Sequence, residues 1–205
     1  MNNHEIPLLP GVCYHIYNHA NGFENLFANE GNYQYFLKKY AQHVCPVADT
    51  FAYCLMPNHF HLLLRIKSLE QLSESLKLSE SSIPSVSNQL SKRFSNFFSS
   101  YAQAFNKQQN RKGSLFVSNF KRKEVSDEWY FARLAHYIHY NPVKDGFVSH
   151  PAEWPHSSFM SLLSERPTRL LREEVLTFFG SRNDFLLAHN LEPEDQFLKI
   201  VSDWF

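Results

Sequence analysis

The chain has 205 residues and a formal net charge of zero, with 20 basic and 20 acidic side chains. This length suffices for one domain with a full hydrophobic core, with or without a small appendage. Aromatic residues make up 16% of the chain, which argues against disorder. The sequence has no apolar run near the roughly 20 residues of a membrane span, and its N-terminus lacks the pattern of a signal peptide. We therefore expect an intracellular, cytoplasmic protein.

Positive charge is concentrated in one segment. From Ser81 to Lys123 there are eight basic residues and no Asp or Glu, which leaves 12 basic and 20 acidic residues elsewhere. Because phosphate backbones are bound by local clusters of positive charge, this segment is predicted to bind nucleic acid. A solvated basic helix without a partner is the alternative. The eight residues are Lys92, Arg93, Lys107, Arg111, Lys112, Lys121, Arg122 and Lys123.

The first half of the chain alternates strand and helix patterns. Residues 12–18 carry alternating β-branched and aromatic residues and predict a strand, and residues 32–44 have apolar residues at helical spacing. Two further strands, 50–56 and 59–66, are joined by Pro57-Asn58 and form a hairpin in the middle of the fold. The Ser-rich stretch 68–87 is predicted to be a mobile linker or a short helix.

The second half is mainly helical. An amphipathic helix is predicted over 88–109, and 114–125 is predicted to be a strand or an extended arm. Asp127 is a suitable N-cap for a helix that Asn141-Pro142 is expected to end. Short helices are expected in the remainder. Together these elements predict an α+β fold, a ferredoxin-like sandwich with helices packed on a central antiparallel sheet and a C-terminal helical extension.

His59 and His61 stand one residue apart at the start of the strand 59–66. Alternate residues of a strand point the same way, so the two imidazoles share a face with Leu63. They are close enough to bind one Mn²⁺ or Zn²⁺ ion, or Mg²⁺ if a substrate phosphate adds oxygen ligands. Two ordinary hydrogen-bonded histidines are the alternative. The opposite face is a continuous apolar stripe of Phe60, Leu62, Leu64 and Ile66.

The phrase AYCLMPNHFHLLL (52–64) resembles the hallmark of the single-tyrosine transposases, His-hydrophobic-His on a central strand, in the form usual in their REP-associated branch. The likeness runs in family order from about residue 12 to about residue 160. It therefore implies a catalytic domain over 1–160 and an accessory helical region over 161–205. The other matching phrases are YHIYNHANGFENLF (14–27), RKGSLFVSNFKRK (111–123), YIHYNPVKDGFV (137–148) and WPHSSF (154–159).

The resemblance implies that Tyr137 is a nucleophile that attacks a DNA phosphodiester, giving a 5′-phosphotyrosine and a free 3′-OH. A divalent metal, Mg²⁺ or Mn²⁺, held by His59 and His61 would polarise the phosphate. Asn141 lies one helical turn beyond Tyr137 and is either a third metal ligand or simply a helix terminator. Tyr140 is the competing nucleophile.

The implied partner is single-stranded DNA with a hairpin, and the implied activity is that of a metal-dependent endonuclease and strand transferase. The basic residues would meet its phosphates, with Lys121, Arg122 and Lys123 near the cleavage point. We expect His136 and His139 to pack or to contact DNA rather than to bind metal. A monomer is expected, with a dimer as the alternative. Two other hypotheses are a host-adopted nucleic-acid-binding protein without cleavage, and a zinc-stabilised module, which the absence of a Cys pair disfavours.

Overall fold

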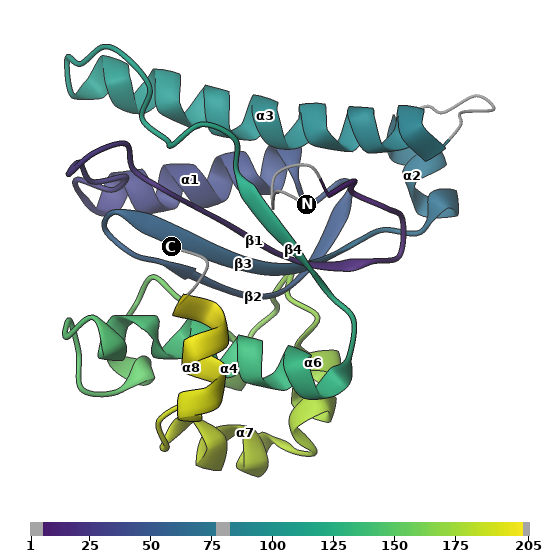
Figure 1. The fold of residues 1–205 in the computed structure, drawn as a ribbon, viewed down its shortest axis with the longest axis vertical. Coiled ribbons are helices and arrows are strands. Elements are labelled where there is room, and N and C mark those ends of the chain that lie inside the picture. The colour runs from purple at the N-terminus through teal and green to yellow at the C-terminus, as the bar shows by residue number, and fades with distance from the viewer. Residues whose placement is uncertain (1–5, 77–82, 203–205) are drawn as a thin grey trace.

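A four-stranded antiparallel sheet lies between two layers of helices in the computed structural model, which describes residues 6–76 and 83–202 (Figure 1). The strand order is β2-β3-β1-β4, so that β1 and β3 are central. This order, with a helix between β1 and β2 and helices between β3 and β4, is the ferredoxin-like topology, and the predicted fold class is confirmed. The strands are β1 (Cys13–His19), β2 (Ala48–Leu55), β3 (His59–Ile66) and β4 (Lys121–Val125).

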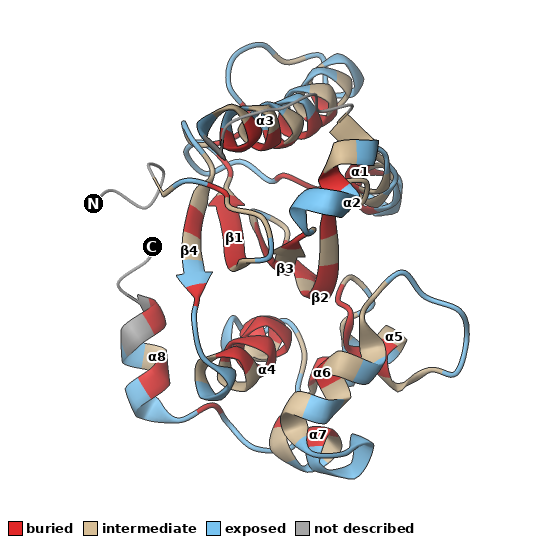
Figure 2. Cartoon of the chain, turned by 90° about the vertical axis from the view of Figure 1, so that its right-hand side faces the viewer, coloured by how far each residue is buried: buried red, intermediate tan, exposed pale blue. Residues whose placement is uncertain are grey.

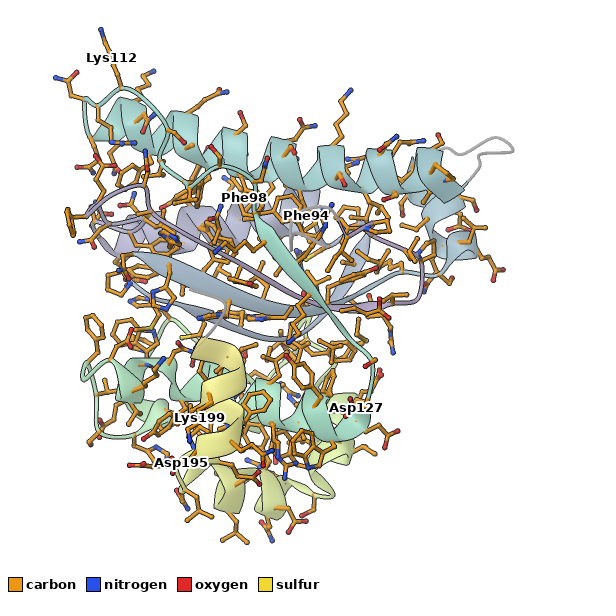
Figure 3. All side chains as sticks on the ribbon, in the orientation of Figure 1. Phe94, Phe98, Lys112, Asp127, Asp195 and Lys199 are labelled. Atoms are coloured by element: carbon orange, nitrogen blue, oxygen red, sulfur yellow. The ribbon has the colours of Figure 1, made fainter. Side chains whose placement is uncertain are left out.

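One face of the sheet is covered by α1 (Glu30–His43) and α3 (Ile83–Gln108), with the short α2 (Leu69–Leu76) preceding α3. An aromatic core joins the three parts: the ring of Phe36 on α1 lies 4.8 Å from that of Phe97 and 5.4 Å from that of Phe60 on β3. Figure 3 shows Phe94 and Phe98 pointing from α3 toward the sheet. The apolar stripe of β3 therefore faces this layer, as its alternation predicted.

The other face is covered by α4 (Glu128–Lys144) and the C-terminal helices, whose buried positions turn toward α4 and the sheet (Figure 2). Val175, Phe185 and Phe197 share one hydrophobic cluster with residues of α4. An ion pair between Arg65 and Glu174, 2.6 Å apart, also ties β3 to the C-terminal part. The further elements are a 3₁₀ helix (Pro151–Glu153), α5 (Phe159–Leu163), α6 (Arg172–Phe179), α7 (Arg182–His189) and α8 (Asp195–Ser202).

The segment predicted as a linker, 68–87, is largely helical where it is described. It contains α2, and α3 begins at Ile83, five residues before the predicted start; residues 77–82 lie outside the described part. The predicted strand 114–125 is shortened to β4, since Asn119 has a φ of 58°. That left-handed conformation does not fit a regular strand. Before it, the arm forms an isolated bridge between Phe116 and Ala20, the residue after β1, and the amide of Val117 donates to the carbonyl of His19.

The prediction that Asn141-Pro142 ends α4 is wrong, because the helix continues to Lys144. Proline lacks only its own N–H, which in the last turn costs one hydrogen bond, and the amide of Asp145 still donates to the carbonyl of Asn141. The end is set by Gly146, at a φ of 74°. Its N–H donates to Val143 and that of Phe147 to Pro142, the paired bonds of a Schellman motif.

No helix of the described ranges is long and apolar enough to cross a membrane.

Candidate active site

The face of the sheet beneath α4 carries an unusual concentration of histidine. In the antiparallel pairing of β1 with β3, His19 lies opposite His59 and Tyr17 lies opposite His61. Residues that pair across two strands project from the same face, so alternation along β1 adds His15 to this set. Because α4 packs against β2 and β3, it closes over these rings. The sheet and α4 thus bring together residues that are about 80 positions apart in the chain.

His59 and His61 lie side by side, with ring centroids 5.1 Å apart. Each uses its Nδ1 atom within the protein: that of His59 is 2.9 Å from Oδ1 of Asn58, and that of His61 is 2.9 Å from Nε2 of His15. The nitrogen that each ring can offer to a metal is therefore Nε2. Burial lowers the pKa of both imidazoles, so both are neutral at pH 7, the state that binds metal ions.

Tyr137 projects from α4 into this cluster. Its ring centroid is 5.7 Å from that of His61, and the side chain is completely buried. Within the described ranges its hydroxyl makes no hydrogen bond of ordinary geometry, although the Asn141 side chain is near enough to lower its pKa in part. Burial raises the pKa of this phenol, and the nearby Asp145 carboxylate raises it further, so Tyr137 is protonated at neutral pH. A buried hydroxyl without a partner costs roughly 1–3 kcal/mol, and such groups often have a function.

Asn141 completes the group. Its amide nitrogen donates to the carbonyl of Tyr137 over 2.8 Å, which leaves the amide oxygen for other contacts. The side chain is a hydrogen-bonding neighbour of both His59 and His61, where it partly offsets the lowering of the pKa by burial. Two imidazole nitrogens and one amide oxygen are suitable ligands for Mn²⁺ or Mg²⁺.

The donor atoms of His59, His61 and Asn141 match an open metal site rather than a closed one. Within the described ranges, no group of three or more His, Cys, Asp or Glu side chains could hold a metal ion. A closed structural zinc site uses four such ligands. The two histidines and Asn141 offer three donor atoms, fewer than such a closed site uses.

The other aromatic and histidine candidates on α4 lie away from His59 and His61. Tyr140 lies beside His136, with ring centroids 6.2 Å apart, and near Glu192. His136 is 3.0 Å from the carbonyl of Leu191, and the ring nitrogens of His139 contact His189 and Ser158. Both histidines therefore pack within the protein, and the geometry favours Tyr137 over Tyr140.

Three residues near the site were not predicted. Lys144 holds its ammonium group 5.5 Å from the centre of the Tyr137 ring, and Asp145 is close enough to raise the pKa of Tyr137 beyond the effect of burial. A helix that ends at Asn141 does not bring them to Tyr137, whereas in a longer helix residues i, i+4, i+7 and i+8 share a face. His15 carried a signal too, because it alternates with Tyr17 and His19 on β1.

The predicted DNA-binding residues of α3 belong to the helix layer on the face of the sheet opposite to the histidines. Lys112 projects outward from the loop after α3 (Figure 3). Lys107 and Lys112 are exposed at the C-terminal end of α3, where the side chain of Gln108 accepts a hydrogen bond from that of Asn32. Lys92 and Arg93 lie in the first half of the same helix. Arg111 forms an ion pair with Glu24 and so braces the loops at this end.

The basic residues of β4 divide between the two faces of the sheet. Lys121 and Lys123 pair with Tyr17 and His15 and therefore lie on the histidine face. Their ammonium groups lie over the rings of Tyr17, at 5.9 Å, and Tyr130, at 5.3 Å. Arg122 points to the opposite face, where it is buried over the ring of Phe120. Two of the three thus flank the site.

The chain resembles known transposases in sequence and in fold, although no family model matches it. A REP-associated tyrosine transposase of Haemophilus influenzae is 28% identical over 113 residues, which cover 54% of this chain and 58% of that protein. The matched part is thus less than two thirds of that relative. A solved structure described as a REP-associated tyrosine transposase bound to a REP hairpin is similar with a TM-score of 0.57 and 16% identity. The likeness covers 80% of this chain and 86% of that one.

At 16% identity the structural likeness shows the fold alone, and the sequence match over 113 residues is a second, separate likeness. In its fold and in the order of its motifs the chain is similar to the single-tyrosine transposases. Within that class, the curated relative and the solved structure that it resembles are both described as REP-associated tyrosine transposases. The resemblance inferred from the phrases around His59 and Tyr137 is therefore confirmed.

Proposed function

We propose that this protein is a metal-dependent endonuclease and strand transferase that cuts single-stranded DNA beside a hairpin, with Tyr137 as the nucleophile. The observation that carries the proposal is the meeting of His59, His61 and Asn141 with the buried Tyr137 hydroxyl. Hairpin DNA is proposed as the substrate because the structurally similar transposase is described as bound to a REP hairpin.

The proposed reaction is a transesterification. The phenolic oxygen of Tyr137 forms a bond to phosphorus, the bond from phosphorus to the 3′ oxygen breaks, and the phenolic proton is balanced by the proton on the new 3′-OH. The products are a 5′-phosphotyrosine and a free 3′ end. Because a phosphodiester is exchanged for another phosphodiester, a later 3′-OH can reverse the step and join new ends without a further co-reactant.

The side chains around Tyr137 have distinct proposed roles. His59, His61 and Asn141 would hold Mg²⁺ or Mn²⁺, which when bound supplies the positive charge that polarises the scissile phosphate. Lys144, Lys121 and Lys123 would attract the DNA strand and balance its negative charge. All these residues belong to one chain, which supports a site that is complete in a monomer.

The test mixes the protein, Mn²⁺ and end-labelled single-stranded DNA containing a hairpin, followed by denaturing gel electrophoresis. A covalent protein–DNA band is expected that disappears with a chelator and in Tyr137→Phe, and persists in the control Tyr140→Phe. A band lost only in Tyr140→Phe would move the nucleophile.

A second candidate, hairpin binding without cleavage, is favoured by one observation. The Tyr137 side chain is 0% exposed, so its cover must shift before the hydroxyl can meet a phosphodiester. If every hairpin tested binds tightly and none gives a covalent band with Mn²⁺ or Mg²⁺, binding alone is the function.

A further inference from the structure

We infer that His15 is a positioning residue, which holds the His61 ring in the tautomer and orientation that present Nε2 to a divalent ion. The inference rests on the proposed function, in which His61 is a metal ligand. The proposed chemistry gives His15 no other task.

The contact is close and buried. Nε2 of His15 lies 2.9 Å from Nδ1 of His61. The rings are stacked at 17° with centroids 5.1 Å apart, and both side chains are completely buried. On its other side His15 stacks on Tyr17, with centroids 4.7 Å apart and the ring planes at 21°. Neighbouring positions on two paired strands therefore leave the His15 ring little freedom to turn.

This contact couples the tautomers of the two rings. A neutral imidazole has one N–H donor and one acceptor nitrogen. If His61 donates from Nδ1 to His15, its Nε2 keeps the lone pair that a metal needs. If His15 donates instead, Nε2 of His61 carries the proton and cannot coordinate. Metal binding therefore requires His15 to act as the acceptor at Nε2, in the same way that outer partners orient metal-bound histidines in other proteins.

His59 is oriented by a different kind of partner. Its Nδ1 faces Oδ1 of Asn58, an exposed loop residue, rather than a buried ring. The two candidate ligands are thus oriented by different kinds of residue. We expect metal binding by His61 to depend more strongly on His15 than metal binding by His59 depends on Asn58.

The chain contains a matched control pair. Nε2 of His189 lies 2.9 Å from Nδ1 of His139, and both side chains are buried. This pair joins α7 to α4 away from His59 and His61. Replacing His189 therefore removes the same kind of contact, at a similar burial, without touching the proposed metal ligands.

The experiment compares Mn²⁺ binding to the wild type, His15→Phe, His15→Gln and His189→Phe, with free Mn²⁺ measured by electron paramagnetic resonance. His15→Phe keeps a flat ring but has no acceptor, and we expect Mn²⁺ affinity to fall about 10- to 100-fold. His15→Gln keeps an oxygen acceptor and should restore most of the affinity. His189→Phe should bind Mn²⁺ like the wild type. Circular dichroism of each variant checks that it is folded.

Two results would overturn the inference. Mn²⁺ affinity unchanged in folded His15→Phe would show that His61 needs no acceptor, and an equal loss in His15→Phe and His15→Gln would show that ring packing matters rather than the hydrogen bond. Failure of the proposed function gives a different result. In that case Mn²⁺ would bind the wild type no more tightly than it binds His61→Asn. The inference about His15 would then fail as well.

Discussion

The ring of Tyr137 meets that of His61 edge-on, with the centroids 5.7 Å apart and the planes at 75°. One residue comes from β3 and the other from α4, so only the packing of the helix on the sheet creates this contact. Its consequence is that a buried phenol lies next to an imidazole that the fold keeps neutral.

Binding of Mn²⁺ should stabilise the folded protein. A ligand present at about 100 times its dissociation constant adds roughly 2.7 kcal/mol to the free energy of unfolding, provided that it binds only the folded state. We expect a higher midpoint of thermal unfolding with Mn²⁺ for the wild type, reversed by a chelator, and little change for His59→Asn. Equal stabilisation of His59→Asn would place the ion elsewhere.

Substitutions of Asn141 should distinguish the effect of its amide oxygen on metal binding from its contribution to the helix. Asn141→Ala keeps helical propensity but removes the amide oxygen, so Mn²⁺ affinity is expected to fall about tenfold. Asn141→Asp retains an oxygen ligand and adds a negative charge, and should bind Mn²⁺ at least as tightly as the wild type. Calorimetric titration measures both, with Asn183→Ala on the exposed surface of α7 as the control. Wild-type affinity in Asn141→Ala would exclude the side chain as a ligand.

The lysines of β4 should contribute more to DNA binding than the basic residues in the first half of α3. In single-stranded DNA each neutralised phosphate contributes about 0.7 to the slope of log affinity against log salt. Lys121→Gln with Lys123→Gln should therefore reduce the slope by about 1.4. Fluorescence anisotropy at several salt concentrations measures it.

The matched control for that pair is Lys92→Gln with Arg93→Gln, which removes the same charge from α3. Since these residues belong to the first half of α3, on the other face of the sheet, the slope should change less. The reverse ranking would move the path of the DNA to the α3 face.

Acid should destabilise the protein through its buried histidines. Burial lowers the pKa of His139 to about 3 and that of His136 to about 4. Each folded-state pKa lies below the ordinary value of about 6.5, so the unfolded chain binds the proton more tightly. The contribution of each neutral histidine to the free energy of unfolding is fully present above pH 6.5. It falls by about 1.4 kcal/mol per pH unit for each histidine as the pH drops toward 4.

Urea unfolding at pH 7.5 and at pH 5 measures this dependence. His139→Gln should lower the stability at pH 7.5, because it loses buried contacts, yet show a smaller difference between the two pH values. The same difference in the variant and the wild type would mean that His139 titrates alike in both states.

The local patterns were most reliable where they depended on alternation. The period of two along β3 placed His59 and His61 on one face and the apolar stripe on the other, as observed. Helix ends were less reliable. Pro142 was read as the end of α4, but a proline in the last turn removes only one bond, and Gly146 provides the actual end. Because of that error, the position of Lys144 and Asp145 near Tyr137 was not predicted.

By itself, the sequence determined the succession of strands and helices along the chain, the resemblance to the transposases, and the face of β3 on which the two histidines lie. These follow from periodicity and from motifs that are contiguous in the chain. Only the tertiary structure decided that His15 contacts His61, that Tyr137 rather than Tyr140 turns toward the imidazoles, and that Arg122 leaves the face shared by Lys121 and Lys123. The reason is physical: strand register and the rotation of a helix on a sheet are set by packing between distant segments, which no local pattern contains.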